Sequence, residues 1–370
     1  MYIKKAEIFT ISIPLIDSFR TSFMELNKRT VLVLKLYDKS GLIGIGESPG
    51  LDIPIYTSDF HYGTILLLRD YLIPSLLNKE INTIDDLLRS YSHIIGNNYA
   101  KIALEASFWH LKSQQNNIPL YKLWGGNKEK IAATISIGFN GDIKGTVEKV
   151  KKYVDRFKLN KLKVKIKPGI DIEFVEKLRE LFPDFSIRID ANGAYTLKDL
   201  DMFKQLDTLG LTMIEQPLMN GDLVDHSILQ KKLKTPICLD ESIHTIHDAE
   251  QAAKIKACRI VNIKPARVGG FWESKKIAEY CASQGISVWC GGLLETGWGQ
   301  LFNCSIATLP NFRHDNDICL TKWYLKDDII QDEIKEKNGH INIEDVHRIY
   351  QKQLDENKFE KYIVDKVIIE

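Results

Sequence analysis

The sequence predicts an α/β protein in which a closed barrel of parallel β/α units lies beside a smaller α+β domain. Three observations support this prediction. Residues 1–50 alternate in hydropathy like antiparallel strands, and helical patterns follow them. From about residue 130, short apolar runs recur roughly every 25 residues, each followed by a helical stretch. The charged tail of the chain ends in one more strand-like run.

The N-terminal region predicts three strands and three helices. Alternating apolar and polar residues define the strands, and residues 38–41 have the composition of a turn between the second and third strand. Apolar residues at helical spacing define the helices. The predicted strands are residues 6–13, 30–37 and 42–47, and the predicted helices are residues 63–77, 84–95 and 99–114. Strands followed by helices are typical of an α+β domain.

The middle of the chain predicts the barrel. Its apolar runs are residues 131–137, 162–166, 186–189, 211–214, 237–239, 259–263 and 286–289. Because each run precedes a helical stretch, we interpret them as parallel βα units, and a period repeated this often favours a closed barrel. We therefore divide the chain into an N-terminal domain (1–125), a barrel (126–322) and a tail (323–370) that packs back on the first domain.

Composition excludes several classes of protein. The 370 residues carry 50 Lys+Arg and 49 Asp+Glu, so the net charge of +1 argues against a nucleic-acid binder. We find neither a signal segment nor an apolar run of the ~18 residues that span a bilayer, and we expect a cytoplasmic protein. The cysteines form no Cys-x-x-Cys pair and are expected to be reduced, mostly buried thiols: Cys238, Cys258, Cys281, Cys290, Cys304 and Cys319.

Three carboxylates end consecutive predicted strands. Asp190, Glu215 and Asp240 follow the third, fourth and fifth runs. The carboxyl ends of parallel barrel strands share one rim, so the three charges should lie side by side and would repel one another unless a cation neutralised them. Oxygen ligands without histidine or cysteine favour Mg²⁺, with Mn²⁺ as a substitute. The alternative interpretation is that these carboxylates cap helices or form ion pairs on the surface.

Lysines end the strands on either side of these carboxylates. Lys163 and Lys165 share one face of the preceding strand, and Lys264 ends the following one. Burial and a neighbouring Lys163 would favour the neutral amine of Lys165, so we expect a lowered pKa there. A cation that stabilises an enolate, flanked by two lysines, fits removal of a proton next to a carboxylate. The alternative to a catalytic role, for any one of these lysines taken singly, is that it lies on the protein surface.

The motifs resemble the enolase superfamily, and within it the muconate-lactonising subgroup. The matching segments are residues 44–47, 163–169, 190–193, 215–217, 239–242, 262–265 and 291–297. The resemblance implies a modified TIM barrel, (β/α)7β-like, with an α+β capping domain formed by the N-terminal region and the tail. It also implies Mg²⁺ ligation by Asp190, Glu215 and Asp240, and Lys165 and Lys264 as the acid/base pair.

The resemblance extends to further site residues. Lys163 is then an auxiliary lysine, and Asn192 and Glu241 orient the ligands. The loop at 291–297 is similar to the o-succinylbenzoate synthase and N-acylamino acid racemase branch, residues 19–23 resemble its mobile cap loop, and Gly138 ends the first barrel strand beside the ligand. The substrate-binding residues implied are Ser136, Gly291, Gly292, Leu293, Tyr56 and Phe23.

The branch implies an activity on a small carboxylate substrate. We expect an Mg²⁺-dependent lyase that forms o-succinylbenzoate for menaquinone synthesis, with N-acylamino acid racemase side activity, and a homo-oligomer without nucleic-acid or membrane partners. The alternative is a racemase, and less favoured alternatives are a dipeptide epimerase or a muconate cycloisomerase. A barrel that binds without catalysis is disfavoured by the complete set of lysines and carboxylates.

Several residues depart from this pattern or carry weaker signals. Trp298 and Gln300 follow the glycine-rich loop, where the branch commonly has smaller apolar or basic residues, and both are expected to reshape the pocket. His110 replaces a common acid and is interpreted as a structural residue of its helix. His244 and His247 lack a third metal ligand and are interpreted as surface histidines.

Overall fold

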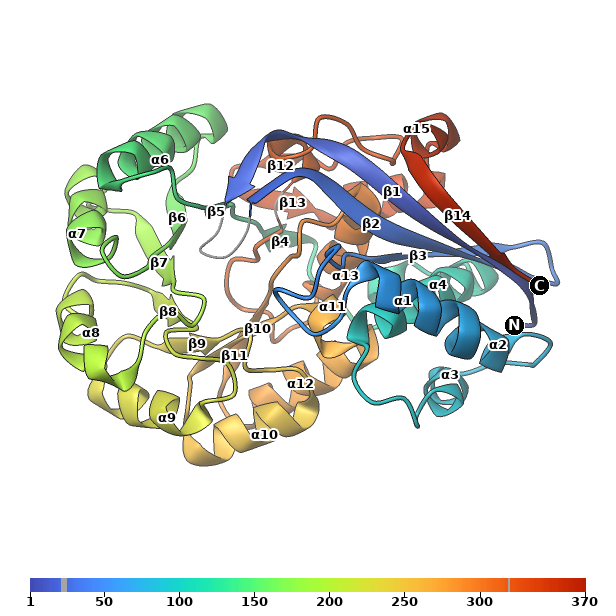
Figure 1. Ribbon diagram of the computed structural model, residues 1–370, viewed down its shortest axis with the longest axis horizontal. Coiled ribbons are helices and arrows are strands. Elements are labelled where there is room, and N and C mark those ends of the chain that lie inside the picture. Colours follow the sequence, from blue (N-terminus) through green and yellow to red (C-terminus); the bar gives the residue numbers. More distant parts are fainter. Residues whose placement is uncertain (21–24, 319) are drawn as a thin grey trace.

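The computed structural model describes residues 1–20, 25–318 and 320–370. It consists of a capping domain and a barrel packed against each other (Figure 1). The capping sheet is antiparallel and has the strand order β14-β1-β2-β3. Its strands are β1 (Ile3–Arg20), β2 (Glu25–Asp38), β3 (Ile43–Ser48) and β14 (Ile363–Ile369). The tail therefore returns to the N-terminal domain as predicted, because β14 pairs with β1.

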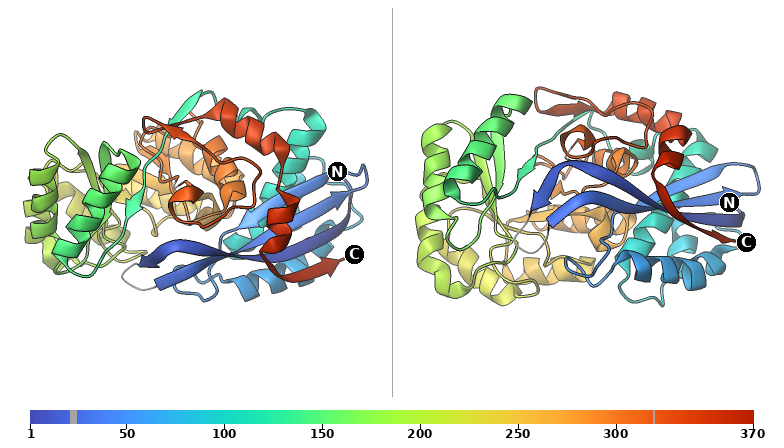
Figure 2. Two further views of the ribbon diagram at one scale, coloured as in Figure 1. Left: turned by 90° about the horizontal axis from the view of Figure 1, so that it is seen from above. Right: turned by 45° about the horizontal axis from the view of Figure 1, so that its top comes forward.

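The first two strands are longer than the predicted runs. Past Pro14 and Lys28, which face each other across the two strands, β1 and β2 continue as a two-stranded arm that reaches Phe19 and Leu26. Figure 2 shows this arm extending from the capping sheet toward the barrel. Residues 15–19 do not alternate in hydropathy, so no strand was predicted there, although Leu15 belongs to the core and Phe19 and Leu26 pack against it.

Helices cover one face of the capping sheet. They are α1 (His61–Leu67), a π-helical turn (Leu68–Leu72), α2 (Ile73–Leu76), α3 (Ile84–Ser90), α4 (Asn98–Asn116) and α5 (Leu120–Leu123). The longest, α4, packs directly on β3. A β-carbon on Gly46 would lie 2.1 Å from the carbonyl oxygen of Ala103, so only glycine allows this approach.

Seven parallel strands form most of the barrel, in the order β11-β10-β9-β8-β7-β6-β5. They are β5 (Ser136–Ile137), β6 (Lys161–Lys165), β7 (Ser186–Asp190), β8 (Met213–Glu215), β9 (Ile237–Leu239), β10 (Ile260–Ile263) and β11 (Ser287–Cys290). The outer helices are α6 (Ile143–Phe157), α7 (Ile172–Leu181), a 3-10 turn (Leu197–Asp199) leading into α8 (Leu200–Leu206), α9 (Leu223–Lys232), α10 (Ile246–Ile255), α11 (Pro265–Val268), α12 (Phe271–Ser283) and α13 (Gly297–Ile306).

The barrel closes through an irregular eighth segment. Residues 312–317 bridge β11 at Val288 and Gly291 on one side, and Ala133 on the other. One prediction is corrected here, because the run 131–137 is not one strand. Its first half is β4 (Lys130–Ala132), which pairs with the tail strand β13 (His340–Asn342), and only its second half enters the barrel.

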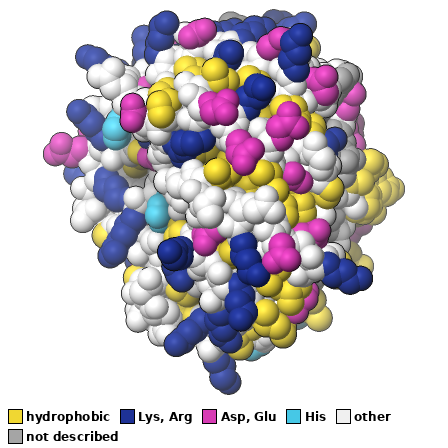
Figure 3. Space-filling model, turned by 90° about the vertical axis from the view of Figure 1, so that its left-hand side faces the viewer, with side chains coloured by type: hydrophobic (Ala, Val, Ile, Leu, Met, Phe, Trp, Pro, Cys, Tyr) yellow, Lys and Arg dark blue, Asp and Glu magenta, His cyan; other side chains and the backbone are white. Residues whose placement is uncertain are grey.

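The tail contributes the remaining elements. They are a 3-10 turn (Thr321–Trp323), β12 (Glu336–Lys337), α14 (Ile343–Lys352) and α15 (Glu356–Lys361). Five of the predicted thiols are buried and free: Cys238, Cys258, Cys281, Cys290 and Cys304. Cys319 lies outside the described residues. The face carried by α6 and its neighbours mixes basic and acidic side chains (Figure 3), in keeping with the balanced charge of the chain.

Candidate active site

The three predicted carboxylates lie together at the carboxyl ends of the barrel strands. Asp190 ends β7, Glu215 ends β8 and Asp240 directly follows β9. The strands are in register, so that Lys165 on β6 is opposite Asp190, and Asp190 is opposite Glu215. All three carboxylates are at most 1% exposed, so their charges must be balanced inside the protein.

Lys163 and Lys165 balance two of these charges. The ammonium nitrogen of Lys163 lies 3.3 Å from Asp190 Oδ2 and 3.0 Å from Glu215 Oε2. It also lies 2.9 Å from Asp317 Oδ2, in the irregular eighth segment. Lys165 donates to Asp190 Oδ2 at 2.6 Å. Asp317 was missed from the sequence because its segment has no strand periodicity.

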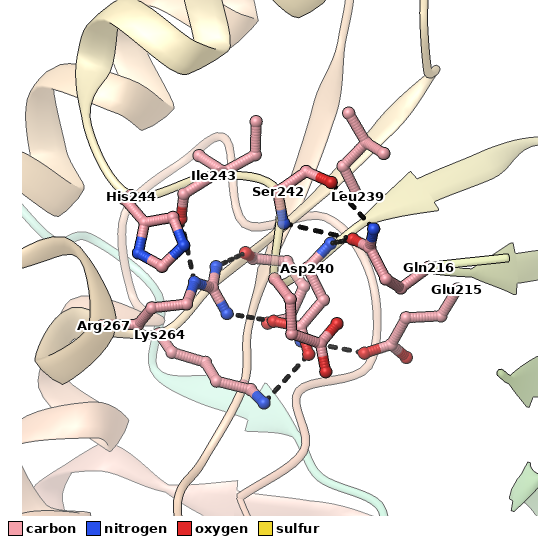
Figure 4. Close-up of polar contacts among 12 residues, drawn as sticks. Glu215, Gln216, Leu239, Asp240, Ser242, Ile243, His244, Lys264 and Arg267 are labelled. Carbon is pink, nitrogen blue, oxygen red and sulfur yellow. Dashed lines mark hydrogen bonds and ion pairs between the residues drawn. The ribbon is translucent and has the colours of Figure 1, made fainter. Parts of the chain in front are cut away.

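The opposite side of the cluster is built on β10 and α11. Lys264 Nζ lies 2.9 Å from Asp240 Oδ2 and donates to Tyr56 Oη at 2.7 Å. Arg267, one turn further on, donates to Asp240 Oδ1 and to the carbonyl oxygen of Ile243, so it fixes the Asp240 loop (Figure 4). Arg267 was also missed, because a single arginine after the lysine motif carries no distinctive signal.

Burial and the paired cations shift the pKa values of these carboxyl groups in different directions. Burial alone would raise the pKa of Asp190, but Lys165 and Lys163 outweigh it and lower that pKa. Burial is likewise outweighed at Asp240, whose pKa Lys264 and Arg267 lower. At Glu215, burial and the negative charge of Asp190 raise the pKa. The ionised forms of Asp190 and Asp240 are thus already stabilised by neighbouring cations. Of the three carboxylates, Glu215 is the one whose ionised form an added positive charge would stabilise most.

The donor set fits a hard divalent cation. Glu241 Oε2 is buried without a hydrogen-bond partner, and the buried oxygens Glu215 Oε2 and Asp240 Oδ2 are approached by the ammonium groups of Lys163 and Lys264 at 3.0 and 2.9 Å. Buried carboxylate oxygens that need nearby positive charge suit Mg²⁺, which prefers oxygen ligands. Among the residues that the structure describes, no three His, Cys, Asp or Glu side chains are already drawn together as a metal-holding group, and lysine ammonium groups lie against the carboxylates instead.

The two predicted orienting residues contact each other. Asn192 Nδ2 donates to Glu241 Oε1 at 2.8 Å, and the Asn192 backbone N–H donates to Asp190 Oδ1 at 3.1 Å. Gln216, which sequence reasoning passed over, has a comparable place (Figure 4). Its Oε1 accepts from the backbone N–H of Asp240 at 3.0 Å and so holds that loop against β8.

A cavity between the barrel rim and the capping domain contains most of the predicted substrate-binding residues. Tyr56, Ser136, Gly138, Gly292 and Leu293 line it, together with the three lysines and Asn192. Phe19 also lines it from the end of β1. Gly291 is not among its lining residues and packs against Asn262, whose Oδ1 would lie 2.3 Å from a β-carbon. Phe23 and most of its predicted loop lie outside the described residues.

Two buried ionic side chains join the capping domain to the loop 293–296. Arg29 donates to the carbonyl oxygens of Gly50 at 2.6 Å, Leu294 at 2.9 Å and Leu293 at 3.1 Å. Glu47 accepts from the backbone N–H of Thr296 at 2.9 Å, at the start of α13. Burial raises the pKa of Glu47 to about 8. Arg29, Leu293 and Leu294 line the cavity and form its roof, whereas Glu47 is not among the lining residues.

Of the three residues that depart from the family pattern, Trp298 and His110 lie in the core and Gln300 lines the cavity. Trp298 is fully buried, stacks on Tyr350 with ring centroids 5.5 Å apart, and does not line the cavity, so the expectation that it reshapes the pocket was wrong. Its ring packs in the core against His110, Phe302 and Tyr350. Gln300 does line the cavity. His110 is structural as predicted, because its Nδ1 accepts from the backbone N–H of Ile45 at 2.9 Å.

The weaker histidine signals do not form a site. The His247 side chain is 71% exposed and contacts Glu250 and Gln251, as expected of a surface residue. The backbone N–H of His244 donates to Asp248 at the start of α10, and burial lowers the pKa of its imidazole. His244 is half-buried and lies near Arg267, so the prediction of a surface histidine was wrong for this residue.

The barrel with paired lysines and strand-end carboxylates defines a class of enzymes. Residues 5–125 match the mandelate racemase / muconate lactonizing enzyme N-terminal domain, and residues 145–347 match the enolase C-terminal domain-like family. The chain belongs to the enolase superfamily, as the motifs predicted.

Particular relatives narrow this class. The chain is 40% identical to the o-succinylbenzoate synthase of Geobacillus kaustophilus over 88% of this chain and 86% of that protein. It is 37% identical to the N-succinylamino acid racemase of Thermus thermophilus over 92% of this chain and 91% of that one. A solved enolase-superfamily structure from Listeria innocua superimposes with a TM-score of 0.93 at 36% identity, covering 100% and 99% of the two chains. In the described part of the chain, no helix is long and apolar enough to cross a membrane.

Proposed function

We propose that this enzyme is an o-succinylbenzoate synthase, which dehydrates 2-succinyl-6-hydroxy-2,4-cyclohexadiene-1-carboxylate. The observation that carries the proposal is the placement of Lys165 and Lys264 on opposite sides of one carboxylate cluster, both lining one cavity. The family and the o-succinylbenzoate synthases among its relatives support the same activity. Cytoplasmic location and assembly into homo-oligomers stay predictions.

The reaction needs a base near the substrate's α-proton and positive charge near its carboxylate. Asp190, Glu215 and Asp240 would hold Mg²⁺, with Mn²⁺ as a substitute, and the ion would supply positive charge for the developing enolate. In the neutral form, Lys165 Nζ takes the proton from C1. The electron pair of that C–H bond is first held in the substrate carboxylate as an enolate, and it then forms the C1–C6 double bond as the C6–O bond breaks. The departing hydroxide takes the proton back from Lys165 and leaves as water, so that both events occur on one face.

The other residues bind and orient. Lys264 stays protonated on the opposite face, since Asp240 and Tyr56 outweigh the effect of burial and raise its pKa. Its ammonium is placed to stabilise the electron-rich ring. Lys163 keeps the carboxylates paired, and Asn192 and Glu241 hold the rim in shape. The Arg29 contacts hold the roof of the cavity in place and help to exclude water.

The second candidate is an N-succinylamino acid racemase on the same site. The observation that favours it is Lys264, which lies across from Lys165 and could return a proton to the opposite face. The racemase of Thermus thermophilus among the relatives supports it. A binding barrel without catalysis has no comparable support.

The test is turnover of the cyclohexadiene substrate with Mg²⁺, alongside α-proton exchange of N-succinylamino acids in D₂O. Fast dehydration that Lys165→Ala reduces at least about 1,000-fold supports the synthase, because the base is lost. We expect Lys264→Ala also to reduce dehydration, and to abolish racemisation. Fast exchange without dehydration would replace the synthase by the racemase. If the wild type catalyses neither reaction, both candidate functions are rejected.

A further inference from the structure

Gln300 carries a buried hydrogen-bond acceptor in the wall of the cavity. It lies near the start of α13, is 1% exposed and lines the cavity. Its Oε1 has no hydrogen-bond partner among the residues that the structure describes. A buried acceptor without a donor costs free energy, and a ligand in the cavity can supply that donor.

Glu295 fixes which way the amide of Gln300 points. Gln300 Nε2 donates to Glu295 Oε2 at 3.3 Å, and the same oxygen accepts from the backbone N–H of Leu293 at 2.8 Å. Glu295 is buried and is not among the residues that line the cavity. Because an ionised carboxylate only accepts hydrogen bonds, the nitrogen of the amide must face it. Oε1 is therefore the polar end of Gln300 that is left for a ligand.

Gly292 keeps this part of the cavity wall thin. It lines the cavity, and a β-carbon on it would lie 3.1 Å from Glu295 Oε2 and 3.7 Å from Gln300 Nε2. The same β-carbon would lie 2.9 Å from the carbonyl oxygen of Asp317. A side chain here would crowd the loop after β11, whereas glycine lets the amide of Gln300 lie at the cavity surface.

The place of Gln300 around the barrel decides which substrate donor it meets. α13 follows β11, and β11 pairs with β10, which Lys264 directly follows. Lys165 is on β6, which is not a neighbour of β11 in the sheet. In the dehydration, the hydroxyl group leaves toward Lys165 and so lies on the other side of the substrate. In an N-acylamino acid, the donor is an amide N–H attached directly to the reacting carbon.

We infer that Gln300 Oε1 accepts a hydrogen bond from the amide N–H of N-acylamino acids and so favours this class of substrate. The inference rests on the proposed function, and it specifies the substrate of the racemase candidate. A ligand of the same length without the N–H leaves Oε1 buried and unpaired. The cyclohexadiene substrate has no N–H and gains nothing from this contact. Because both partners are neutral, the preference should change little with salt concentration.

The experiment is calorimetric titration, with Mg²⁺ present, of N-succinylglycine and of 4-oxoheptanedioate, which has CH₂ in place of the N–H. The two compounds carry the same two carboxylates, and neither has a stereocentre that the enzyme can invert. We expect the wild type to bind N-succinylglycine roughly 10-fold tighter, because a buried hydrogen bond is missing from the other complex.

Two substitutions separate the acceptor from the structure around it. Gln300→Met removes both polar atoms of the amide, whereas Gln300→Lys removes the acceptor and keeps a donor for Glu295. Both should reduce the ratio of the two affinities to about one. Gln251→Met changes an exposed glutamine of α10, is the matched control and should keep the wild-type ratio.

Kinetics give a second readout. Gln300→Lys should raise KM for an N-succinylamino acid about 10-fold, and more than it raises KM for the cyclohexadiene substrate, because only the amino acid loses a hydrogen bond. The kcat of racemisation should change less than KM, because the N–H is held both before and during proton transfer.

Two results would overturn the inference. One is a wild type that binds both compounds equally or binds neither, and the other is a Gln300→Lys variant that keeps the wild-type ratio. The synthase activity is judged separately, by turnover of the cyclohexadiene substrate, so the inference and the proposed function can fail independently.

Discussion

At the scale of single residues, the site is a balance of buried charges. Lys163 is 2% exposed and lies among three carboxylates, one of them Asp317 from outside the regular strands. Glu215 is the carboxylate whose pKa burial and Asp190 raise, so it should respond most to an added cation. A cation that binds at these residues should therefore stabilise the protein, because an ion that binds only the folded state shifts the equilibrium toward it.

We predict that Mg²⁺ stabilises the wild type and that Glu215→Gln removes this effect. At a concentration 100 times the Kd, the gain is about 2.7 kcal/mol, because binding is confined to the folded state. Thermal unfolding with Mg²⁺ and after chelation measures it. Glu176→Gln, an exposed residue of α7, is the control and should respond to Mg²⁺ like the wild type. An equal Mg²⁺ effect in Glu215→Gln would argue against Glu215 as a ligand.

At the scale of elements, long-range strand pairing joins the tail to the capping domain. β14 adds to the outer edge of β1, and Glu7 on β1 accepts from Tyr37 on β2 and lies 2.8 Å from Lys366 on β14. Burial alone would raise the pKa of Glu7, but hydrogen bonds from Lys366, Tyr37 and Lys5 lower it to about 2. One carboxylate thus links three strands of the sheet.

We predict that Glu7 makes the fold sensitive to acid. Its folded pKa lies below the unfolded value of 4.5, so its stabilisation is present above about pH 5 and is lost as pH falls through 4.5 toward 2. Glu7→Gln should cost about 1 kcal/mol at pH 7 and much less at pH 3, as measured by urea unfolding. The exposed Glu360→Gln is the control. A Glu7→Gln loss that is the same at both pH values would contradict the prediction.

At the scale of the whole molecule, the cavity exists because two domains close on each other. The carbonyl groups that Arg29 binds belong to Thr30, Pro49 and Gly50 in the capping domain and to Leu293 and Leu294 in the barrel. The same loops supply Leu51, Gly292 and Leu293 to the cavity lining. Domain contact and substrate binding should therefore change together.

We predict that Arg29→Met loosens the domain contact. It should lower the unfolding free energy by about 2 to 4 kcal/mol, because several buried carbonyl groups lose their donor. It should also raise KM more than it lowers kcat, because the roof of the cavity is displaced. Unfolding curves and steady-state kinetics measure the two effects. Lys28→Met changes the exposed neighbour on β2 and should match the wild type in both measurements. An Arg29→Met variant with an unchanged KM would show that the roof of the cavity does not affect substrate binding.

The sequence by itself determined the family, the barrel and the strand-end charges of Lys165, Asp190, Glu215 and Asp240. These follow from local pattern, because periodic hydropathy defines each strand and the charge that ends a strand must lie at the rim. The substrate contacts that the resemblance supplied stay predictions, and Gly291 is not among the residues that line the cavity.

Only the tertiary structure decided which distant groups complete the site. Asp317 comes from a segment without strand periodicity, Arg267 reaches Asp240 from a short helix, and Arg29 binds backbone carbonyls that no sequence pattern marks. The physical reason is the same in each case, because a contact between residues far apart in the chain depends on how the elements pack, and local periodicity does not record it.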